Sequence, residues 1–600
     1  MEYLSQWYIK VAGRNVSEEI MDDIISIEVD DSLHLPDMFS IHLRDQLGGS
    51  GSYKWMDSNT LDLGKPVVIS ADPKGEEEKG ELLSGEITAI EPEFIKDIGA
   101  AILIRGYDRS HRLHRGKKTT SFLQQSDSQI VSKIAQTCGL QADVEATRPT
   151  HEHVIQDNQT DMEFIQERAW RNGYFTYVDH NKLVFRSKPA TSGPAPVLKW
   201  GENLYEFQAR LTTADQVEKA EVHSWDTSQK KAILGTQASP SPIKPGISGE
   251  THGGNAAKKA FGGQSVEVVI NHPVDTLDEA NAIAQSVINE KCNEFLQAEG
   301  TCDGNPAVRA GATIKIQGIG KKFSGSYMIT HAIHRYDGSG YTTWFEISGY
   351  HANTLGQLLS NNSNGKKGYG VVVGQVTNLN DPDNLGRVKV KYPGISDDLE
   401  SHWARMVNPM AGPQRGFEFL PEVNDEVLVT FEYNDINHPY ILGGLWNGKD
   451  KPPLTTNGAV KDGKVNKRII KSRSGHTITL DDTDGNEKIS IIDKTQKNLV
   501  EIDSKENTVA IKTEKNSMVI GTSKNTLTIN TDGDITIQAK GNVTLKGKDV
   551  TLEATANAKV KATSNLDLEA NSKTTVKGNA GVDVNASGQV NVKGAVINLN

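Results

Sequence analysis

Residues 535–554 read ITIQAKGNVTLKGKDVTLEA, and this short repeat decides the fold of the C-terminal quarter of the chain. Apolar residues recur in pairs separated by one polar residue, so both members of a pair lie on the same face of a β-strand. The same spacing extends from residue 478 to residue 599, with Thr574 as the one polar member. The pairs are Ile478/Leu480, Ile489/Ile491, Val500/Ile502, Val509/Ile511, Met518/Ile520, Leu527/Ile529, Ile535/Ile537, Val543/Leu545, Val550/Leu552, Ala558/Val560, Leu566/Leu568, Thr574/Val576, Val582/Val584, Val590/Val592 and Ile597/Leu599.

The interval between pairs indicates how these strands are arranged. It falls from 11 residues at the start to eight or seven at the end, and Gly, Asn and Lys fill the corners. A strand of three or four residues cannot bury its own apolar pair, and a prism closed by one chain would repeat every third strand. We therefore expect three chains wound into an intertwined parallel β-helix, a rod of about 70 Å that narrows toward its end. Disorder, which the composition alone suggests, conflicts with this regularity.

The composition of the whole chain excludes several classes of protein. Its 600 residues suggest about four domains, and 65 basic against 77 acidic residues give a net charge of -12, which argues against a nucleic-acid partner. Three cysteines exclude a disulfide framework and a four-cysteine zinc site. The first residues carry no signal-peptide pattern, and no run of about 18 apolar residues occurs, so we expect cytoplasmic assembly without a signal peptide.

The middle of the chain predicts a small barrel. About five short strands and tight turns occupy residues 369–453, as expected for an OB fold. OB folds often bind nucleic acid in a basic groove, but the mixed charge of this segment favours a structural collar.

The N-terminal part alternates strands with three predicted helices. One runs over Ser126–Cys138, one over Asp161–Asn172 with Gly173 as its stop, and the longest starts at the capping box formed by Thr276 and Glu279. This part is therefore mainly β with some helices.

Two groups of motifs carry a resemblance to a known family. The OB segment, with its turn residues Asp381, Pro382, Gly386, Arg387, Pro421 and Asn424, resembles the OB domain of VgrG-type spike proteins of contractile injection systems. Asn424 stands where that family usually has Gly, and Asn is the next most tolerant of a left-handed backbone. Residues 36–39, 106–113, 156–164 and 323–334 resemble the family's hub, also called the late-control D protein.

The resemblance implies a domain order. It places a hub of two tube-like β-barrels with helical insertions at 1–355, a linker at 356–368, an OB-fold collar at 369–453, a second linker at 454–476 and the trimeric β-helix spike at 477–600.

The resemblance also implies a function. The chain would be the central spike of a contractile injection machine, joining the hexameric inner tube to a membrane-puncturing needle. The style of the hub motifs at Gly106–His111 and Gln156–Gln159 favours an extracellular contractile injection system. A type VI secretion VgrG or a phage baseplate hub-spike is the alternative.

The partners implied are a homotrimer, inner-tube and baseplate proteins, cargo effectors and, transiently, the target membrane. A PAAR-repeat tip protein would bind at Val596, Ile597, Leu599 and Asn600. The assembled particle would be extracellular or delivered into the target cell on firing.

Signs of catalysis are weak, so we expect neither an enzyme nor a bound cofactor or metal. No metalloprotease, phosphate-loop or serine-hydrolase motif occurs. His151 and His153 share a strand face without an evident third ligand, which favours ordinary surface polarity over a metal site. Between Pro453 and Ile478 there is no room for a lysozyme domain, which argues against a cell-wall hydrolase. A trimeric fibre or adhesin would need a receptor-binding head, and the hub motifs argue against it.

Overall fold

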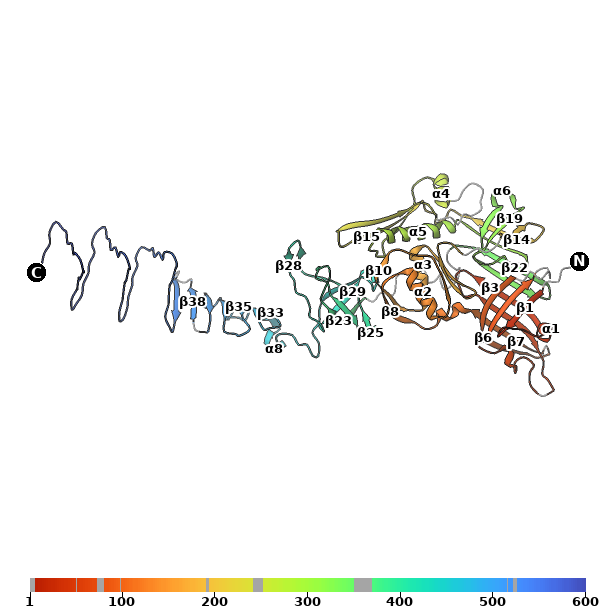
Figure 1. Cartoon of the computed structure of the whole chain (residues 1–600), viewed down its shortest axis with the longest axis horizontal. Coiled ribbons are helices and arrows are strands. Elements are labelled where there is room, and N and C mark those ends of the chain that lie inside the picture. The colour runs from red at the N-terminus through yellow and green to blue at the C-terminus, as the bar shows by residue number, and fades with distance from the viewer. Residues whose placement is uncertain are drawn as a thin grey trace. The chain divides into compact units, whose positions relative to one another are not determined.

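The computed structural model describes residues 6–49, 51–72, 80–97, 99–189, 194–240, 252–349, 370–514, 516–521 and 526–599. The chain divides into two compact units, Met1–Lys451 and Pro452–Asn600, which are described separately (Figure 1). With 42% strand and 14% helix, it has the mainly β fold predicted from the sequence. The predicted linker at 356–368 lies outside the described residues.

A single 11-stranded sheet organises the hub. Its order is β14-β18-β22-β21-β3-β4-β7-β6-β5-β1-β2. The strands are β1 (Gln6–Val11), β2 (Arg14–Asn15), β3 (Ile24–Ser32), β4 (Met38–Asp45), β5 (Pro66–Asp72), β6 (Gly80–Ile95), β7 (Gly99–Asp108), β14 (Leu204–Leu211), β18 (Leu296–Asp303), β21 (His331–Asp337) and β22 (Gly340–Ile347). Strand β3 pairs antiparallel with β21, about 300 residues further along the chain, and this pairing joins two halves into one sheet.

Each half of the sheet has its own apolar core. Ile27, Phe39 and Ile104 are buried in the N-terminal half, beside the short helix α1 (Glu18–Asp23). Tyr327 and Phe345 are buried in the other half, which also contains β13 (Val197–Lys199), β19 (Thr313–Gln317), α6 (Gly320–Phe323) and β20 (Gly325–Met328). The prediction of two repeated hub halves is confirmed, and the structure adds that they share one continuous sheet.

The three predicted helices are present. Ser126 and Gln129 cap α2 (Asp127–Thr137), and α3 (Asp161–Asn172) ends at Gly173, whose φ is 66°. Thr276 caps α5 (Leu277–Asn293) by accepting from the backbone of Glu279. Among the described residues, no helix is long and apolar enough to cross a membrane.

Small sheets surround these helices. Helices α2 and α3 share a core with β8 (Lys118–Ser126), β9 (Gln141–Val144), β10 (Thr150–Gln159), β11 (Phe175–Asp179) and β12 (Lys182–Arg186). Helix α5 packs on β15 (Lys219–Asp226) and β16 (Lys231–Gln237), next to α4 (Gly253–Phe261) and β17 (Val266–Val269).

Residues 370–446 form the predicted OB-type barrel. Its sheet order is β25-β24-β23-β29-β30-β26, and a bridge between Val388 and Ala404 joins the two ends. The strands are β23 (Val371–Asn378), β24 (Lys389–Tyr392), β25 (Ser396–Glu400), β26 (Arg405–Met406), β29 (Glu426–Phe431) and β30 (Pro439–Gly444), with the small hairpin β27 (Ala411–Gly412) and β28 (Arg415–Gly416). Ile155 of β10 contributes to the barrel core, and its backbone N–H donates to Asn437, so the barrel docks on the hub.

The second unit begins with α8 (Thr456–Ala459) and the hairpin of β31 (Val460–Lys461) and β32 (Lys464–Val465). A seven-stranded sheet follows in chain order: β33 (Lys467–Lys471), β34 (Thr477–Asp481), β35 (Lys488–Ile492), β36 (Leu499–Asp503), β37 (Thr508–Lys512), β38 (Asn516–Gly521) and β39 (Thr526–Thr531). Every neighbouring pair is antiparallel. The parallel arrangement predicted from the sequence is wrong for this stretch, because its connections are only three to six residues long and parallel strands need a crossover of a dozen or more.

From residue 532 to residue 599 the chain pairs with no strand of its own. Short straight segments alternate with bends at 532–533, 540–541, 548, 555–556, 563–564, 571–572, 579–580, 587–588 and 595, so the eight-residue period of the sequence is also the period of the structure. Figure 1 shows this stretch winding in successive open turns beyond β39.

Candidate functional site

One face of the seven-stranded sheet carries only apolar side chains, which we call the apolar ladder. Ile478 lies opposite Ile491, Leu480 opposite Ile489, and the same register continues strand by strand to Ile529. The described members from Ile478 to Ile529 are 38–51% exposed. Ala510 is the one buried hydrophobic residue among the described residues of this unit. A single chain therefore leaves its main apolar surface in water.

The opposite face of this sheet carries charge. Lys467 pairs with Asp481 at 3.2 Å, and Lys488 pairs with Asp503 at 2.7 Å. Asp481 and Lys488 also lie opposite one another, so opposite charges alternate along one column of the sheet. Because a slip of one residue would exchange the apolar and charged faces, this column and the ladder together fix the register.

The wound segment after residue 532 exposes its apolar pairs even more. The first apolar members of the pairs from Ile535 to Ile597 are 49–56% exposed, and the second members from Ile537 to Leu599 are 66–90% exposed. Within the described part of this segment neither the backbone nor the apolar side chains find strand partners in the same chain. A backbone this extended and regular needs partners from outside the chain.

The predicted tip residues lie at the end of this segment. Val596 is 76% exposed, Ile597 is 49% exposed and Leu599 is 90% exposed, while Asn600 lies outside the described residues. Their binding to a tip protein stays a prediction.

Asp381 organises the first signature turn of the OB barrel. Its carboxylate accepts backbone N–H groups of Asp383, Leu385 and Arg387 at 2.9–3.2 Å, and the Arg387 guanidinium at 2.6 Å. Burial alone would raise the pKa of Asp381, but these hydrogen bonds hold it well below its usual range. Pro382 lies in the same turn, and Gly386 adopts a φ of 70°. The turn is a rigid structural element, and the structure brings these four predicted residues together.

The second signature turn contains Pro421 and Asn424. Asn424 has a φ of 78°, so it adopts the left-handed backbone expected of the glycine it replaces. Its N–H donates to Val376 at 2.9 Å, and the carboxylate of Asp425 accepts the N–H of Glu422 at 2.8 Å.

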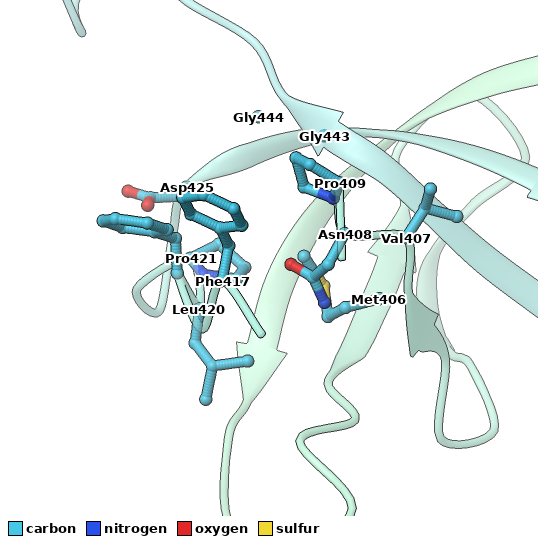
Figure 2. A pocket seen from close by; sticks show the side chains of 11 residues that line it. Met406, Val407, Asn408, Pro409, Phe417, Leu420, Pro421, Asp425, Gly443 and Gly444 are labelled. Atoms are coloured by element: carbon cyan, nitrogen blue, oxygen red, sulfur yellow. The ribbon is translucent and has the colours of Figure 1, made fainter. Parts of the chain in front are cut away.

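An apolar groove that the sequence did not reveal lies beside this turn. Its cavity measures about 400 Å³ and is lined by Met406, Val407, Asn408, Pro409, Phe417, Phe419, Leu420, Pro421, Asp425, Gly443 and Gly444. Figure 2 shows Phe417, Pro421 and Asp425 on one side of it and Pro409 and Met406 on the other. The available signal was the stretch Phe417-Glu-Phe419-Leu420, three large apolar residues in a turn-rich loop.

His151 and His153 occupy two different environments. His151 is 12% exposed and lies 3.3 Å from both Asp127 and Glu279. His153 faces the OB barrel, bonds the carbonyl of Glu400 at 3.0 Å, and burial lowers its pKa to about 4. The expectation of surface polarity is therefore wrong, because both rings are largely enclosed. Among the described residues no group of three ligands suits a metal ion.

Two hub motifs meet at a buried acidic cluster that also escaped the sequence. The N–H of Asp108 donates to the carbonyl of Asp37 at 2.8 Å, and Asp31 lies 3.5 Å from Arg309. Burial raises the pKa of all three carboxyls, to about 7 for Asp108. This cluster lies where β3, β7 and the second half of the hub come together, and its role is structural.

Comparison with known families matches most of this architecture. The family described as the Alg8 N-terminal domain matches residues 2–337, more than half of the chain. The chain belongs to the Alg8 N-terminal domain family. In this Alg8-type chain, residues 372–446 also match the type VI secretion system/phage-baseplate injector OB domain.

Curated relatives of this Alg8-type chain are VgrG spike proteins. It is 24% identical over 417 residues to the type VI secretion system spike protein VgrG3 of Vibrio cholerae, which covers 63% of this chain and 39% of that protein. It is 28% identical over 109 residues to spike protein VgrG2a of Pseudomonas aeruginosa, covering 17% and 12%. The resemblance to VgrG-type spike proteins is thus confirmed, although the chain spans well under half the length of these relatives.

The fold is also that of a solved VgrG assembly. A chain of the Francisella PdpA-VgrG complex in its half-lidded form aligns with a TM-score of 0.50, covering 88% of each chain at 10% identity. At that identity the match establishes the fold of the Alg8-type chain and no more.

Proposed function

We propose that this chain is the central spike of a contractile injection machine, joining the inner tube to a membrane-puncturing needle. The single observation that carries the proposal is the apolar ladder. It leaves one face of a regular sheet uncovered, and the homology to VgrG spike proteins gives that sheet a context.

Three copies satisfy the needs of the second unit. Three antiparallel sheets that turn their ladders inward bury one common core, and fully burying a Val, Leu or Ile side chain contributes about 1.5–3 kcal/mol. Beyond residue 532, strands of the other copies supply the hydrogen bonds that one chain lacks. The charged column then faces water. Such a prism has no free strand edge along its length, which suits a rod that must resist bending and compression.

The hub suits the other end of the machine. Its sheet contains two halves joined through β3 and β21. Three copies present six halves, which match a sixfold tube. In this role inner-tube and baseplate proteins contact the hub, the OB barrel forms a collar, and the spike works mechanically rather than as a catalyst.

The same proposal assigns the remaining partners. A small PAAR-type protein covers the exposed apolar ends at Val596, Ile597 and Leu599, because three blunt apolar chain ends would otherwise form an exposed patch. Cargo effectors are carried by the spike, and the Francisella VgrG in complex with PdpA is an example of a spike that holds another protein. On firing, the needle contacts the target membrane only in passing.

The type of machine follows from the hub motifs, which favour an extracellular contractile injection system. A type VI secretion spike is the second candidate, favoured by the names of the curated relatives. Genes encoding sheath, tube and an ATPase next to this gene support the first if membrane-complex genes are absent, and the second if those genes are present.

The mass of the assembled full-length chain tests the proposal. Light scattering coupled to size-exclusion chromatography should give three copies of the 65.4 kDa chain, and electron microscopy should show a thin rod. A well-ordered monomer would contradict the proposal.

A further inference from the structure

The OB barrel carries an exposed apolar surface that its own core does not use. Phe417, Phe419 and Leu420 around the groove in Figure 2 are 40–60% exposed, and none of them belongs to the barrel core. The surface continues over further residues that are 47–51% exposed: Val407, Met410 and Val423. Contiguous apolar surface of this kind marks an interaction site more often than a chance exposure.

The loop that presents these side chains is rigid. The N–H of Phe417 donates to the carbonyl of Met410 at 3.1 Å across the β27–β28 hairpin. Gly416 has a φ of 153°, and a Cβ there would lie 2.5 Å from the carbonyl oxygen of Met410. The loop also contains Pro409, Pro413 and Pro421. A partner therefore meets a surface that is already ordered, which lowers the entropic cost of binding.

The chemistry of the groove selects an apolar protein surface. Its one charged lining residue is Asp425, and that carboxylate is already bonded to the N–H of Glu422. Nothing basic lines it, so nucleic acid or an acidic peptide does not fit.

The position of the groove in the chain points to a second copy as the occupant. Gly443 and Gly444 form part of its wall, and 11 residues later α8 opens the unit that carries the apolar ladder. At no more than about 3.6 Å per residue, this connection spans at most about 40 Å. Copies that share one ladder core must therefore hold their OB barrels within reach of each other.

We propose that the groove is the contact between neighbouring OB barrels, where an apolar surface of the next copy's barrel packs against Phe417, Phe419 and Leu420. This inference rests on the proposed function, because it needs copies joined through the second unit. In a threefold ring the contact is head-to-tail, so the groove meets a different surface of the next copy. The barrels then lock the three chains together independently of the needle.

A photo-cross-link tests the contact in the full-length chain. The photoreactive amino acid p-benzoylphenylalanine replaces Phe419, the purified assembly is irradiated, and cross-linked peptides are mapped by mass spectrometry. We expect covalent dimers whose cross-links fall within residues 370–446 of another copy. The matched control carries the same amino acid at Phe261, which is 78% exposed on α4, and should give no cross-link to that segment.

The outcomes separate this inference from the proposed function. An assembly of three copies in which Phe419 reacts only within its own chain, or not at all, overturns the inference and leaves the trimer intact. A monomer overturns both. As a second readout, the double variant Phe417→Ser/Phe419→Ser should remain trimeric but lose hydrogen-exchange protection in residues 407–423, and unchanged protection contradicts the proposed contact.

Discussion

The OB barrel and the needle sheet are both small β structures, yet only the barrel completes its core within one chain. Val390, Tyr392, Val427 and Val429 are fully buried in the barrel. In the needle sheet the same kinds of residue are about half exposed, although the strands pair regularly. The difference shows that regular hydrogen bonding does not by itself make a folded unit, because the apolar face must also be covered. The needle sheet is therefore part of an assembly, whereas the barrel can stand alone.

The largest expected effect comes from placing a charge in the ladder. Ile491→Lys puts one ammonium per copy into the proposed common core, where an unpaired buried charge costs several kcal/mol per ion. We expect loss of the trimer, measured as mass in solution. Ser490→Lys, one residue away on the opposite face and opposite Glu501, should leave the trimer intact. Equal behaviour of the two variants would mean that the ladder faces water in the assembly.

A large-to-small change in the barrel should act in the opposite manner. Tyr392→Ala removes a fully buried ring, which typically costs about 3–5 kcal/mol of unfolding free energy. Because this core lies within one chain, the loss should not depend on protein concentration. Denaturant unfolding at two protein concentrations measures both properties. A concentration-dependent loss would show that the barrel, like the needle, depends on its neighbours.

The buried hub cluster predicts a dependence on pH. The folded-state pKa of Asp108 is raised to about 7, so folding favours its protonated form. Its contribution to stability is complete below the unfolded pKa near 3.9 and is lost as the pH rises through about 7. Asp31 and Asp37 act in the same direction, since burial also raises their pKa values. Asp108→Asn should therefore lose less stability than the parent chain between pH 4 and pH 7.5 in thermal melts, and parallel pH profiles would contradict the prediction.

The smallest expected effect concerns the second signature turn of the barrel. A non-glycine residue in the left-handed region costs roughly 1–2 kcal/mol, and Asn pays less than most. Asn424→Ala should therefore destabilise the barrel by about 1 kcal/mol, while Asn424→Gly should change it by less and in the stabilising direction. Denaturant unfolding of the two variants checks the order. The needle, which has no residue in this turn, should keep its assembled mass in both.

The sequence predicted best where one rule acts alone. The pairs at spacing two, the stop at Gly173 and the capping box at Thr276 are local signals, and each appears in the structure as expected. The predicted direction of the needle strands was wrong, although the longer intervals near Ile489 already contained a hairpin connection rather than a corner. The shortening of the intervals thus reports a change of architecture near residue 531, and not only a narrowing of the rod.

Residues that depend on distant segments could not be predicted. The environment of His151 comes from Asp127 and Glu279, and that of His153 from the OB barrel. The acidic cluster joins Asp31, Asp108 and Arg309 from three separate parts of the hub. The groove depends on Pro409 and Phe417 facing each other across a loop, which no local pattern records.

The switch from hairpins before residue 531 to an open winding path after residue 532 has a kinetic consequence. If three copies braid along the final segment, no subunit can leave or enter a finished needle unless that segment first unwinds from its end. A mixture of two differently tagged, preassembled needles would then stay unmixed for as long as the braid holds. The machine would thus inherit a spike whose composition is set once, at assembly, and kept until it is used.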